Sequence, residues 1–189
     1  MDILADKDAL RRQYRQKREE YVVRLSPQDK ELAFSAVPSP IKNLFQPDKS
    51  VAAFIPLPSE ADPARLLTYA ADIGCRTALP YVTGKAAPMQ FLAWRPGDPL
   101  YDGPFNLQQP DSEAAIIHPD IVIVPLVAFD RSLNRLGQGA GHYDRALSLL
   151  SDSTAIGLAW SVQEHDFLPA DPWDMPLDAI LTEKEWITR

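Results

Sequence analysis

The stretch of sequence that most constrains the fold is a glycine-rich segment between an apolar run and a helical pattern. Residues 121–124 (IVIV) are β-branched throughout, and the run ends at Pro125. Such a run is typical of a strand buried on both faces of a parallel sheet. Helical spacing then links four further positions: Tyr143, Ala146, Leu147 and Leu150. This stretch therefore predicts a buried strand, a glycine-rich connection and a helix, as in α/β proteins.

The glycine-rich connection places Gly137, Gly139 and Gly141 at alternate positions around Gln138 and Ala140. Glycine adopts positive φ without steric cost, so backbone N–H groups can converge on one point. A helix N-terminus directly after them favours an anion, which indicates a phosphate site. The alternative is a tight connection without a ligand. The pattern GxGxG lacks the Gly-Lys-Ser/Thr of a P-loop and differs by one residue from GxGxxG, so spacing alone identifies no nucleotide fold.

The remaining sequence predicts one α/β domain over residues 1–189 with a mostly parallel or mixed sheet flanked by helices. Residues 51–55 form a buried apolar run, and Asp62-Pro63 begins a helical pattern that ends near Gly74. Extended patterns resume at residues 77–79, 89–94 and 154–160. Strand, helix and strand at this spacing predict a right-handed βαβ unit. Ser26-Pro27 indicates another helix start, whose apolar face extends to Val37, followed by a turn at residues 43–45.

Positive charge gathers near the N-terminus of a chain whose formal net charge is −7. A helix predicted over residues 6–21, with Asp6 as N-cap, carries a basic stripe at steps of four, four and three residues: Lys7, Arg11, Arg15 and Arg18. Residues four apart share a helix face, so Lys7 and Arg11 can converge on one polyphosphate. A solvated amphipathic helix without a ligand is the competing interpretation.

Composition limits the possible partners and the compartment. A pI near 4.9 argues against general nucleic-acid binding, which needs a basic face. No apolar run in the sequence is long enough to span a bilayer. Cys75 is the only cysteine, which fits a reducing compartment. We therefore expect a cytoplasmic protein, a monomer, with small-molecule ligands and without membrane or nucleic-acid partners.

The residues of the central stretch resemble a known family signature. Phe129-Asp130, Arg135-Leu136-Gly137 and Gly141-His142-Tyr143-Asp144-Arg145 are similar to the pattern FDxxxxRLGxGxGYYDR of the 5-formyltetrahydrofolate cyclo-ligase (5,10-methenyltetrahydrofolate synthetase) family. Lys7-x-x-x-Arg11 resembles the KxxLR opening of these enzymes, and residues 174–183 resemble their LDxxxTE-like tail. His142 replaces the usual Tyr, and Gln138 stands where the family often has an aromatic or basic residue. The acid of a Gly-x-x-Glu-Pro element is missing at Gln109-Pro110, and we assign that region no chemistry.

The resemblance implies a Rossmann-like, three-layer fold shared with sugar isomerases and CoA-transferases, and a site for ATP. Lys7, Arg11 and Arg135 would be catalytic, stabilising the transferring phosphoryl group. The ATP site would comprise Lys7, Arg11, Arg135, Leu136, Gly137, Gln138, Gly139, Ala140, Gly141, His142 and Tyr143.

The resemblance also implies a folate site and a magnesium site. The folate site would comprise Ile55, Glu60, Gln138, Gly139, Ala140, Gly141 and His142, with Glu60 accepting from the pterin and Ile55 walling it. From position alone Glu60 follows a strand end, where α/β sheets bind ligands, but it could equally be an ordinary surface acid. Asp144 and Asp174 would hold Mg²⁺, with Asp178 in reserve, because Mg²⁺ accepts hard oxygen ligands. Glu164, Asp166 and Asp171 are expected to be solvated.

The implied reaction is the ATP-dependent closure of 5-formyltetrahydrofolate to 5,10-methenyltetrahydrofolate, with ADP and phosphate as the other products. It needs no protein nucleophile, which is consistent with a sequence that shows no Ser-His-Asp arrangement and no reactive Cys. Two other classes of function remain open. One is a non-catalytic folate or nucleotide-binding module, and the other is an enzyme related to sugar-phosphate isomerases or CoA-transferases, for which Glu60 would have to act as the base or nucleophile.

Overall fold

The computed structural model describes residues 3–84, 87–104 and 107–189. The helices formed by these residues are α1 (Ile3–Arg24), α2 (Pro27–Leu32), α3 (Ser39–Leu44), α4 (Ala64–Asp72), α5 (His142–Ser148) and the 3₁₀ helix η2 (Ser161–Gln163). The strands are β1 (Ser50–Ala52), β2 (Arg76–Tyr81), β3 (Gln90–Ala93), β4 (Tyr101–Asp102), β5 (Gln108–Gln109), β6 (Ile121–Pro125), β7 (Ala128–Phe129), β8 (Arg135–Leu136), β9 (Thr154–Leu158), β10 (Ala179–Leu181) and β11 (Trp186–Ile187).

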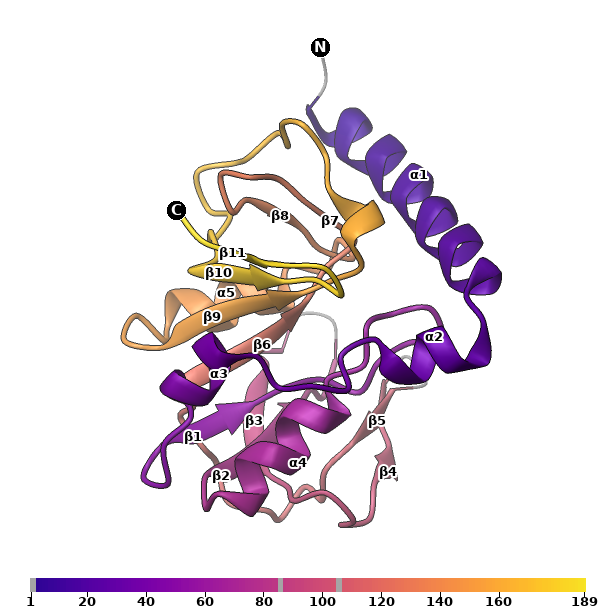
Figure 1. Ribbon diagram of the computed structural model, residues 1–189. Coiled ribbons are helices and arrows are strands. Elements are labelled where there is room, and N and C mark those ends of the chain that lie inside the picture. Colours follow the sequence, from indigo (N-terminus) through magenta and orange to yellow (C-terminus); the bar gives the residue numbers. More distant parts are fainter. Residues whose placement is uncertain (1–2, 85–86, 105–106) are drawn as a thin grey trace.

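The centre of the molecule is a seven-stranded mixed sheet in the order β11-β10-β9-β6-β1-β2-β3 (Figure 1). Neighbouring strands from β10 through β9, β6 and β1 to β2 are parallel. Both edge strands, β11 and β3, pair antiparallel with their neighbours. The expected mixed sheet flanked by helices is confirmed, and the predicted βαβ unit corresponds to β1, α4 and β2.

The sheet is buried on both faces. Ile121, Val122, Ile123 and Val124 in β6 are at most 3% exposed. Successive side chains of a strand point to opposite faces, so β6 contributes to both cores. One core includes apolar residues of α3 and α4, and the other includes apolar residues of α5. Helices thus cover the two faces of the sheet, and the resulting three layers are those expected from the sequence.

The connectivity of the sheet creates a topological switch point between β1 and β6. From β1 the chain crosses to β2 on one side, whereas from β6 it crosses to β9 on the other. The carboxyl ends of β1 and β6 therefore lie at a topological switch point, where open α/β sheets bind ligands. The segment that contains Glu60 follows β1, and the glycine-rich segment lies beyond β6.

The N-terminal half departs from the predictions in three places. Helix α1 extends from Ile3 to Arg24, beyond the predicted 6–21, so Asp6 lies within the helix and is not its N-cap. Nothing between these ends breaks a helix, because the first proline is Pro27. The Ser26 cap is confirmed by a 3.1 Å bond from Asp29 N, but α2 ends at Leu32, with no buried side chain. Helix α3 occupies the predicted turn, with Pro40 in its first turn, where a missing N–H costs nothing.

A hairpin that the sequence did not reveal separates β6 from the glycine-rich segment. Strands β7 and β8 pair antiparallel, and Asp130 holds the turn between them by accepting from Ser132 N and Asn134 N. The glycine-rich segment therefore follows β8. None of the helices formed by the described part of the chain has an apolar stretch long enough to cross a bilayer.

Candidate active site

The glycine-rich loop, residues 137–141, turns the chain from β8 into α5. Gly139 has φ of +107° and Gly141 has φ of +66°, whereas Gly137 has no left-handed backbone. The positive φ predicted for this segment is therefore confirmed at two of the three glycines. Gly141 is the N-cap of α5, so the loop presents its backbone at a helix N-terminus. That position favours an anion, because the free N–H groups and the helix dipole both point towards it.

Helix α1 places basic side chains directly against this loop. Arg11 Nε donates to Gly137 O at 3.0 Å, and a Cβ added at Gly139 would lie 3.5 Å from Arg11 Cζ. Arg15 donates from Nη2 to the Gln138 side-chain oxygen at 2.7 Å. The basic stripe is therefore not a solvated helix face. Arg11 and Arg15 contact the loop although more than 120 residues separate α1 from the loop in sequence.

Lys7 lies one turn before Arg11 and is only 4% exposed. Its Nζ is 2.6 Å from Asp171 Oδ2 and 2.5 Å from Asp174 Oδ2. Asp171 N also donates to Asp174 Oδ2, which fixes the two carboxylates relative to each other. Burial pushes the pKa of Lys7 down, but the hydrogen bonds and charges of the two aspartates outweigh it, and the pKa is raised. Lys7 is thus a cation held between two carboxylates.

Asp171 corrects an expectation from the sequence. The sequence predicts a solvated side chain for Asp171. In the structure this side chain is only 16% exposed and forms an ion pair with Lys7. Burial of that pair follows from the contact between α1 and the segment after η2, which a local pattern does not encode. Only the spacing of three residues between Asp171 and Asp174 could have suggested a shared role. Asp178, by contrast, accepts from Ala155 N at the amino end of β9.

Arg135 and Asp144 form a second ion pair beneath the loop. Arg135 Nη2 is 2.6 Å from Asp144 Oδ1, and Met175 N donates to the same oxygen at 3.2 Å. Because Met175 follows Asp174, this bond brings Asp144 and Asp174 to the same part of the molecule. Arg135 is 9% exposed, and its Nε finds no hydrogen-bond partner within the described ranges. A buried donor without a partner indicates a place for a ligand or water.

Tyr143 carries a second buried donor without a hydrogen-bond partner in the described part of the chain. This donor is the side-chain hydroxyl. Burial, with a contribution from the charge of Glu60, raises the pKa of Tyr143, so the hydroxyl keeps its proton and can donate. The guanidinium of Arg135 lies 6.0 Å from the centre of the Tyr143 ring. Both unpaired donors thus belong to the same small region.

The surroundings of His142 favour its neutral form. Burial lowers its pKa, and the neighbouring charge of Arg145 lowers it further. Arg145 Nη2 lies 3.2 Å from His142 Nδ1, and Arg145 Nη1 donates to Ala140 O at 3.0 Å. Arg145 therefore braces the end of the loop from α5.

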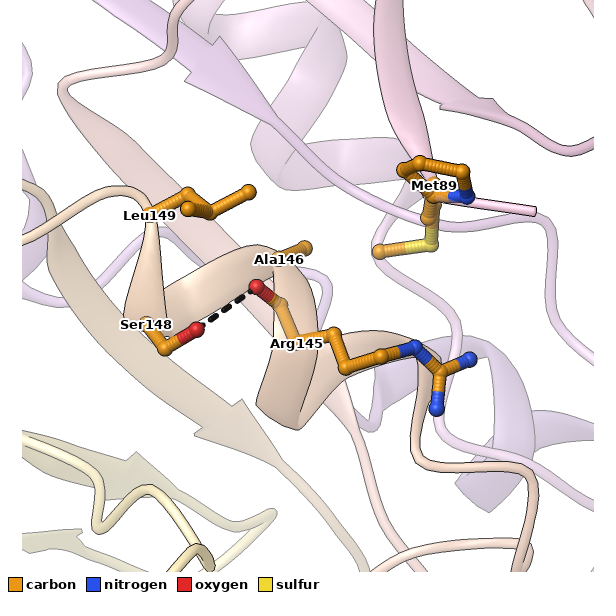
Figure 2. A pocket seen from close by; sticks show the side chains of 6 residues that line it. Met89, Arg145, Ala146, Ser148 and Leu149 are labelled. Atoms are coloured by element: carbon orange, nitrogen blue, oxygen red, sulfur yellow. Dashed lines mark hydrogen bonds between the residues drawn. The ribbon is translucent and has the colours of Figure 1, made fainter. Parts of the chain in front are cut away.

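A cavity of about 290 Å³ lies beside α5. It is open to solvent and is lined by Pro88, Met89, Arg145, Ala146, Ser148 and Leu149. Figure 2 shows Met89 facing Ala146 of α5 and Leu149, which directly follows that helix, with the Arg145 side chain extending along one side. Most of its lining is apolar, and only Arg145 connects it to the loop. It lies outside the charged cluster formed by α1, the loop and residues 171–174, so we assign it no part in the site.

Glu60 lies in the segment after β1, next to the glycine-rich loop. Its side chain is 7% exposed, and Leu57 N donates to its Oε2 at 3.0 Å. Gln138 Nε2 donates to its Oε1 at 3.0 Å, which links Glu60 to the glycine-rich loop. Ile55, the residue that would wall a pterin, is half-buried and packs against the core at the end of the same segment. The structure therefore places Glu60 against the loop and not as a solvated surface acid.

The carboxylates present fit a magnesium ion that arrives with a polyphosphate. Over residues 3–84, 87–104 and 107–189, no group of three His, Cys, Asp or Glu side chains could hold a metal by itself. Mg²⁺ usually takes only one or two carboxylates, with phosphate and water as its other ligands. Asp144 and Asp174 meet that requirement. Each now pairs with a cation, Arg135 or Lys7, which a bound phosphate could engage instead.

Comparisons with known proteins agree on one family. The model of the 5-formyltetrahydrofolate cyclo-ligase family matches residues 3–183. The chain is 34% identical over 148 residues to the 5-formyltetrahydrofolate cyclo-ligase of Mycolicibacterium smegmatis, covering 74% of this chain and 76% of that one.

Solved structures of similar proteins extend the likeness to nearly the whole chain. The 5,10-methenyltetrahydrofolate synthetase of Aquifex aeolicus superposes with a TM-score of 0.76 at 30% identity, covering 96% of this chain and 92% of the other. For the enzyme of Mycoplasma pneumoniae the TM-score is 0.69 at 29% identity, with 94% and 99% covered.

Proposed function

The chain belongs to the 5-formyltetrahydrofolate cyclo-ligase family, and from that premise we propose that it uses ATP and Mg²⁺ to close 5-formyltetrahydrofolate to 5,10-methenyltetrahydrofolate. The formyl oxygen attacks the γ-phosphorus of ATP, and ADP leaves. The lone pair of N10 then attacks the formyl carbon, phosphate leaves and N10 loses its proton. The bond between the γ-phosphorus and ADP breaks in the first step and releases ADP. In the second step the bond between the formyl carbon and its oxygen breaks and releases phosphate, and the N10–H bond releases a proton.

The observation that carries this proposal is the convergence of α1 on the glycine-rich loop. A loop that ends at a helix N-terminus favours phosphate, and Arg11 lies against Gly139 at its centre. Phosphoryl transfer requires little covalent chemistry from a protein, because positioning and charge stabilisation supply most of the catalysis. A triphosphate held between the loop amides and the cations of α1 meets both requirements.

The cations have distinct parts in the proposal. Lys7 and Arg11 bind the phosphate oxygens from α1, and Arg135 supplies the charge beneath the loop. Backbone N–H groups of residues 136–143 bind the remaining oxygens, and the neutral His142 is a further donor. Lys7 must exchange at least one of its aspartate contacts for phosphate when ATP binds. This exchange keeps the buried ammonium paired before and after binding.

In this proposal the folate binds at the segment after β1, which carries Ile55 and Glu60. A carboxylate accepts hydrogen bonds from neighbouring N–H groups of a pterin ring, and Glu60 is preorganised by Leu57 and Gln138. Residues 138–142 lie between this segment and α1, so the loop can contact both substrates. The formyl group and the γ-phosphate would thus meet at the loop.

The magnesium ion is assigned to Asp144 and Asp174. When bound, it would neutralise phosphate charge as the phosphoryl group transfers. Asp144 and Asp174 hold the ion, while Arg135 and Lys7 remain close enough to bind the same phosphate. We also assign residues 1–189 to one catalytic domain, because the site draws on both α1 and the segment after η2.

The test is to follow the absorbance of 5,10-methenyltetrahydrofolate on mixing the protein with 5-formyltetrahydrofolate, ATP and Mg²⁺. Turnover is expected only with all three present, and ADP should form in equal amount to the product. Product formation without ATP would contradict the proposal and would favour an isomerase-like reaction. Folate binding without turnover would instead favour a binding module.

A further inference from the structure

Arg18 is a buried arginine of α1 for which the proposed ATP site has no use. It is only 3% exposed, whereas its neighbours Lys17 and Glu19 are exposed. Eleven residues separate it from Lys7, which corresponds to about 16 Å along a helix. Arg18 therefore lies well away from the Lys7 end of α1, at the part of the helix that faces the segment after β1.

Within the described residues, the hydrogen bond and the ion pair of the Arg18 side chain are both with that segment. Arg18 Nε donates to Ser59 Oγ at 3.0 Å, and Arg18 Nη1 lies 3.5 Å from Glu60 Oε1. The Glu60 side chain is 7% exposed, so both members of this ion pair are shielded from water. Trp160 Nε1 donates to Ser59 O and holds the segment from the other side.

The pair also limits what Glu60 can still accept. Oε1 faces both Arg18 and Gln138, and Oε2 accepts from Leu57 N. A carboxylate has about four acceptor positions, so the free capacity is on Oε2. Leaving a buried carboxylate without its cation is costly, and such a side chain turns towards water or another donor. This movement would displace the acceptor that the pterin requires.

We propose that Arg18 is a positioning residue for the folate half of the site, which keeps the Glu60 carboxylate oriented towards the pterin. This inference rests on the proposed function, because it assumes that Glu60 binds the pterin. It gives α1 two tasks along one basic stripe. Lys7 and Arg11 serve the phosphates, and Arg18 serves the folate.

Gln138 extends the same network to the loop. Its side-chain nitrogen donates to Glu60, and its side-chain oxygen accepts from Arg15. The amide therefore has its donor and acceptor ends fixed by two different segments. This arrangement accounts for Gln138 at a position where the family often has another residue type, and for the third member of the basic stripe.

The experiment compares Arg18→Met, Glu60→Gln and the double variant with the parent enzyme, measuring kcat and both KM values. Arg18→Met should raise the KM for 5-formyltetrahydrofolate about tenfold or more and leave the KM for ATP within about twofold. Glu60→Gln should have a similar effect, and the double variant should lose little more than either single one, because both changes remove the same interaction. Arg18→Lys, which retains the charge, should recover part of the loss.

Arg12→Met is the matched control, since Arg12 is an exposed residue of the same helix, and its constants should equal those of the parent. A folded Arg18→Met enzyme with an unchanged folate KM, with both KM values raised equally, or with fully additive losses would overturn the inference. Should Arg18→Met fail to fold, Ser59→Ala replaces it and should raise the folate KM alone by about threefold; an unchanged value would overturn the inference. Parent enzyme without turnover would instead refute the proposed function.

Discussion

Two clusters of charged side chains in this molecule have the same arrangement of charges, but one is buried and the other is exposed to solvent. In each, one cation lies between two carboxylates. Lys7 pairs with Asp171 and Asp174, and its side chain is 6% exposed. Arg131 pairs with Glu164 and Glu185, and its side chain is 54% exposed.

The two clusters differ in how strongly water screens and solvates their charges. Exposed ion pairs contribute little to stability, because solvent screens them and ordering long side chains costs entropy. A buried cation must recover a large desolvation free energy from its partners, and removing it leaves two carboxylates facing each other. The carboxylates around Arg131 raise its pKa, as they do for Lys7, so the direction of the pKa shift does not separate the two clusters. Burial beside the glycine-rich loop does.

The largest effect is expected from removing the buried cation. Lys7→Met should lower kcat/KM for ATP about 100-fold or more, because a preorganised positive charge is lost where phosphate charge develops. Arg131→Met is the matched control and should retain parent activity. Steady-state kinetics with thermal melting of both variants checks this. A folded Lys7→Met enzyme with near-normal turnover would place Lys7 outside the site.

The next effect is expected from the carboxylate assigned to both Lys7 and magnesium. Asp174→Asn should raise the Mg²⁺ concentration for half-maximal turnover at least about tenfold. Asp178→Asn is the control, since Asp178 binds Ala155 N at the far end of β9. Titration of Mg²⁺ at saturating ATP distinguishes the two. If Asp178→Asn showed the larger shift, the assignment of the metal ligand would be reversed.

A smaller effect is expected from Asp171, the partner of Lys7 with no assigned ligand. Asp171→Asn leaves Lys7 paired with Asp174, so it should lower the free energy of unfolding by about 1 kcal/mol. The KM for ATP should stay the same or fall, because one competitor for the ammonium is gone. Urea denaturation and ATP titrations provide the two measurements. A tenfold rise in that KM would mean that Asp171 itself takes part in binding ATP.

The smallest effect is expected from the exposed cluster. Arg131→Ala should leave kcat and both KM values unchanged and should lower the melting temperature only slightly, with the difference shrinking as salt is added. Differential scanning calorimetry at low and high ionic strength measures this. A large loss of activity would show that exposure alone does not distinguish the two clusters.

The parts of the fold that the sequence predicted are those set by short-range patterns. The β-branched run at residues 121–124 predicted β6, Asp62-Pro63 and Gly74 bounded α4, and alternate glycines predicted positive φ at Gly139 and Gly141. The predictions failed for short elements, namely helix α3 and the hairpin of β7 and β8. Such elements are too short to carry a clear period, and their neighbours in the fold decide their structure.

The candidate site shows the same division. A step of four residues put Lys7 and Arg11 on one helix face, and the family signature identified the loop. The partners of those residues were not predictable from local patterns: Asp171 lies 164 residues from Lys7, and Glu60 lies 42 residues from Arg18. Asp171 and Asp178 look alike as acids in one segment, yet only Asp171 is paired with Lys7.

The sequence by itself determined the longer central strands, the basic face of the first helix and a loop able to bind phosphate, because backbone preference and side-chain periodicity act over a few residues. The tertiary structure alone decided which charges are buried and paired. The energy of a charge depends on its exposure and on the distance to its partner, and both are set when α1 packs against β7, η2 and the glycine-rich loop.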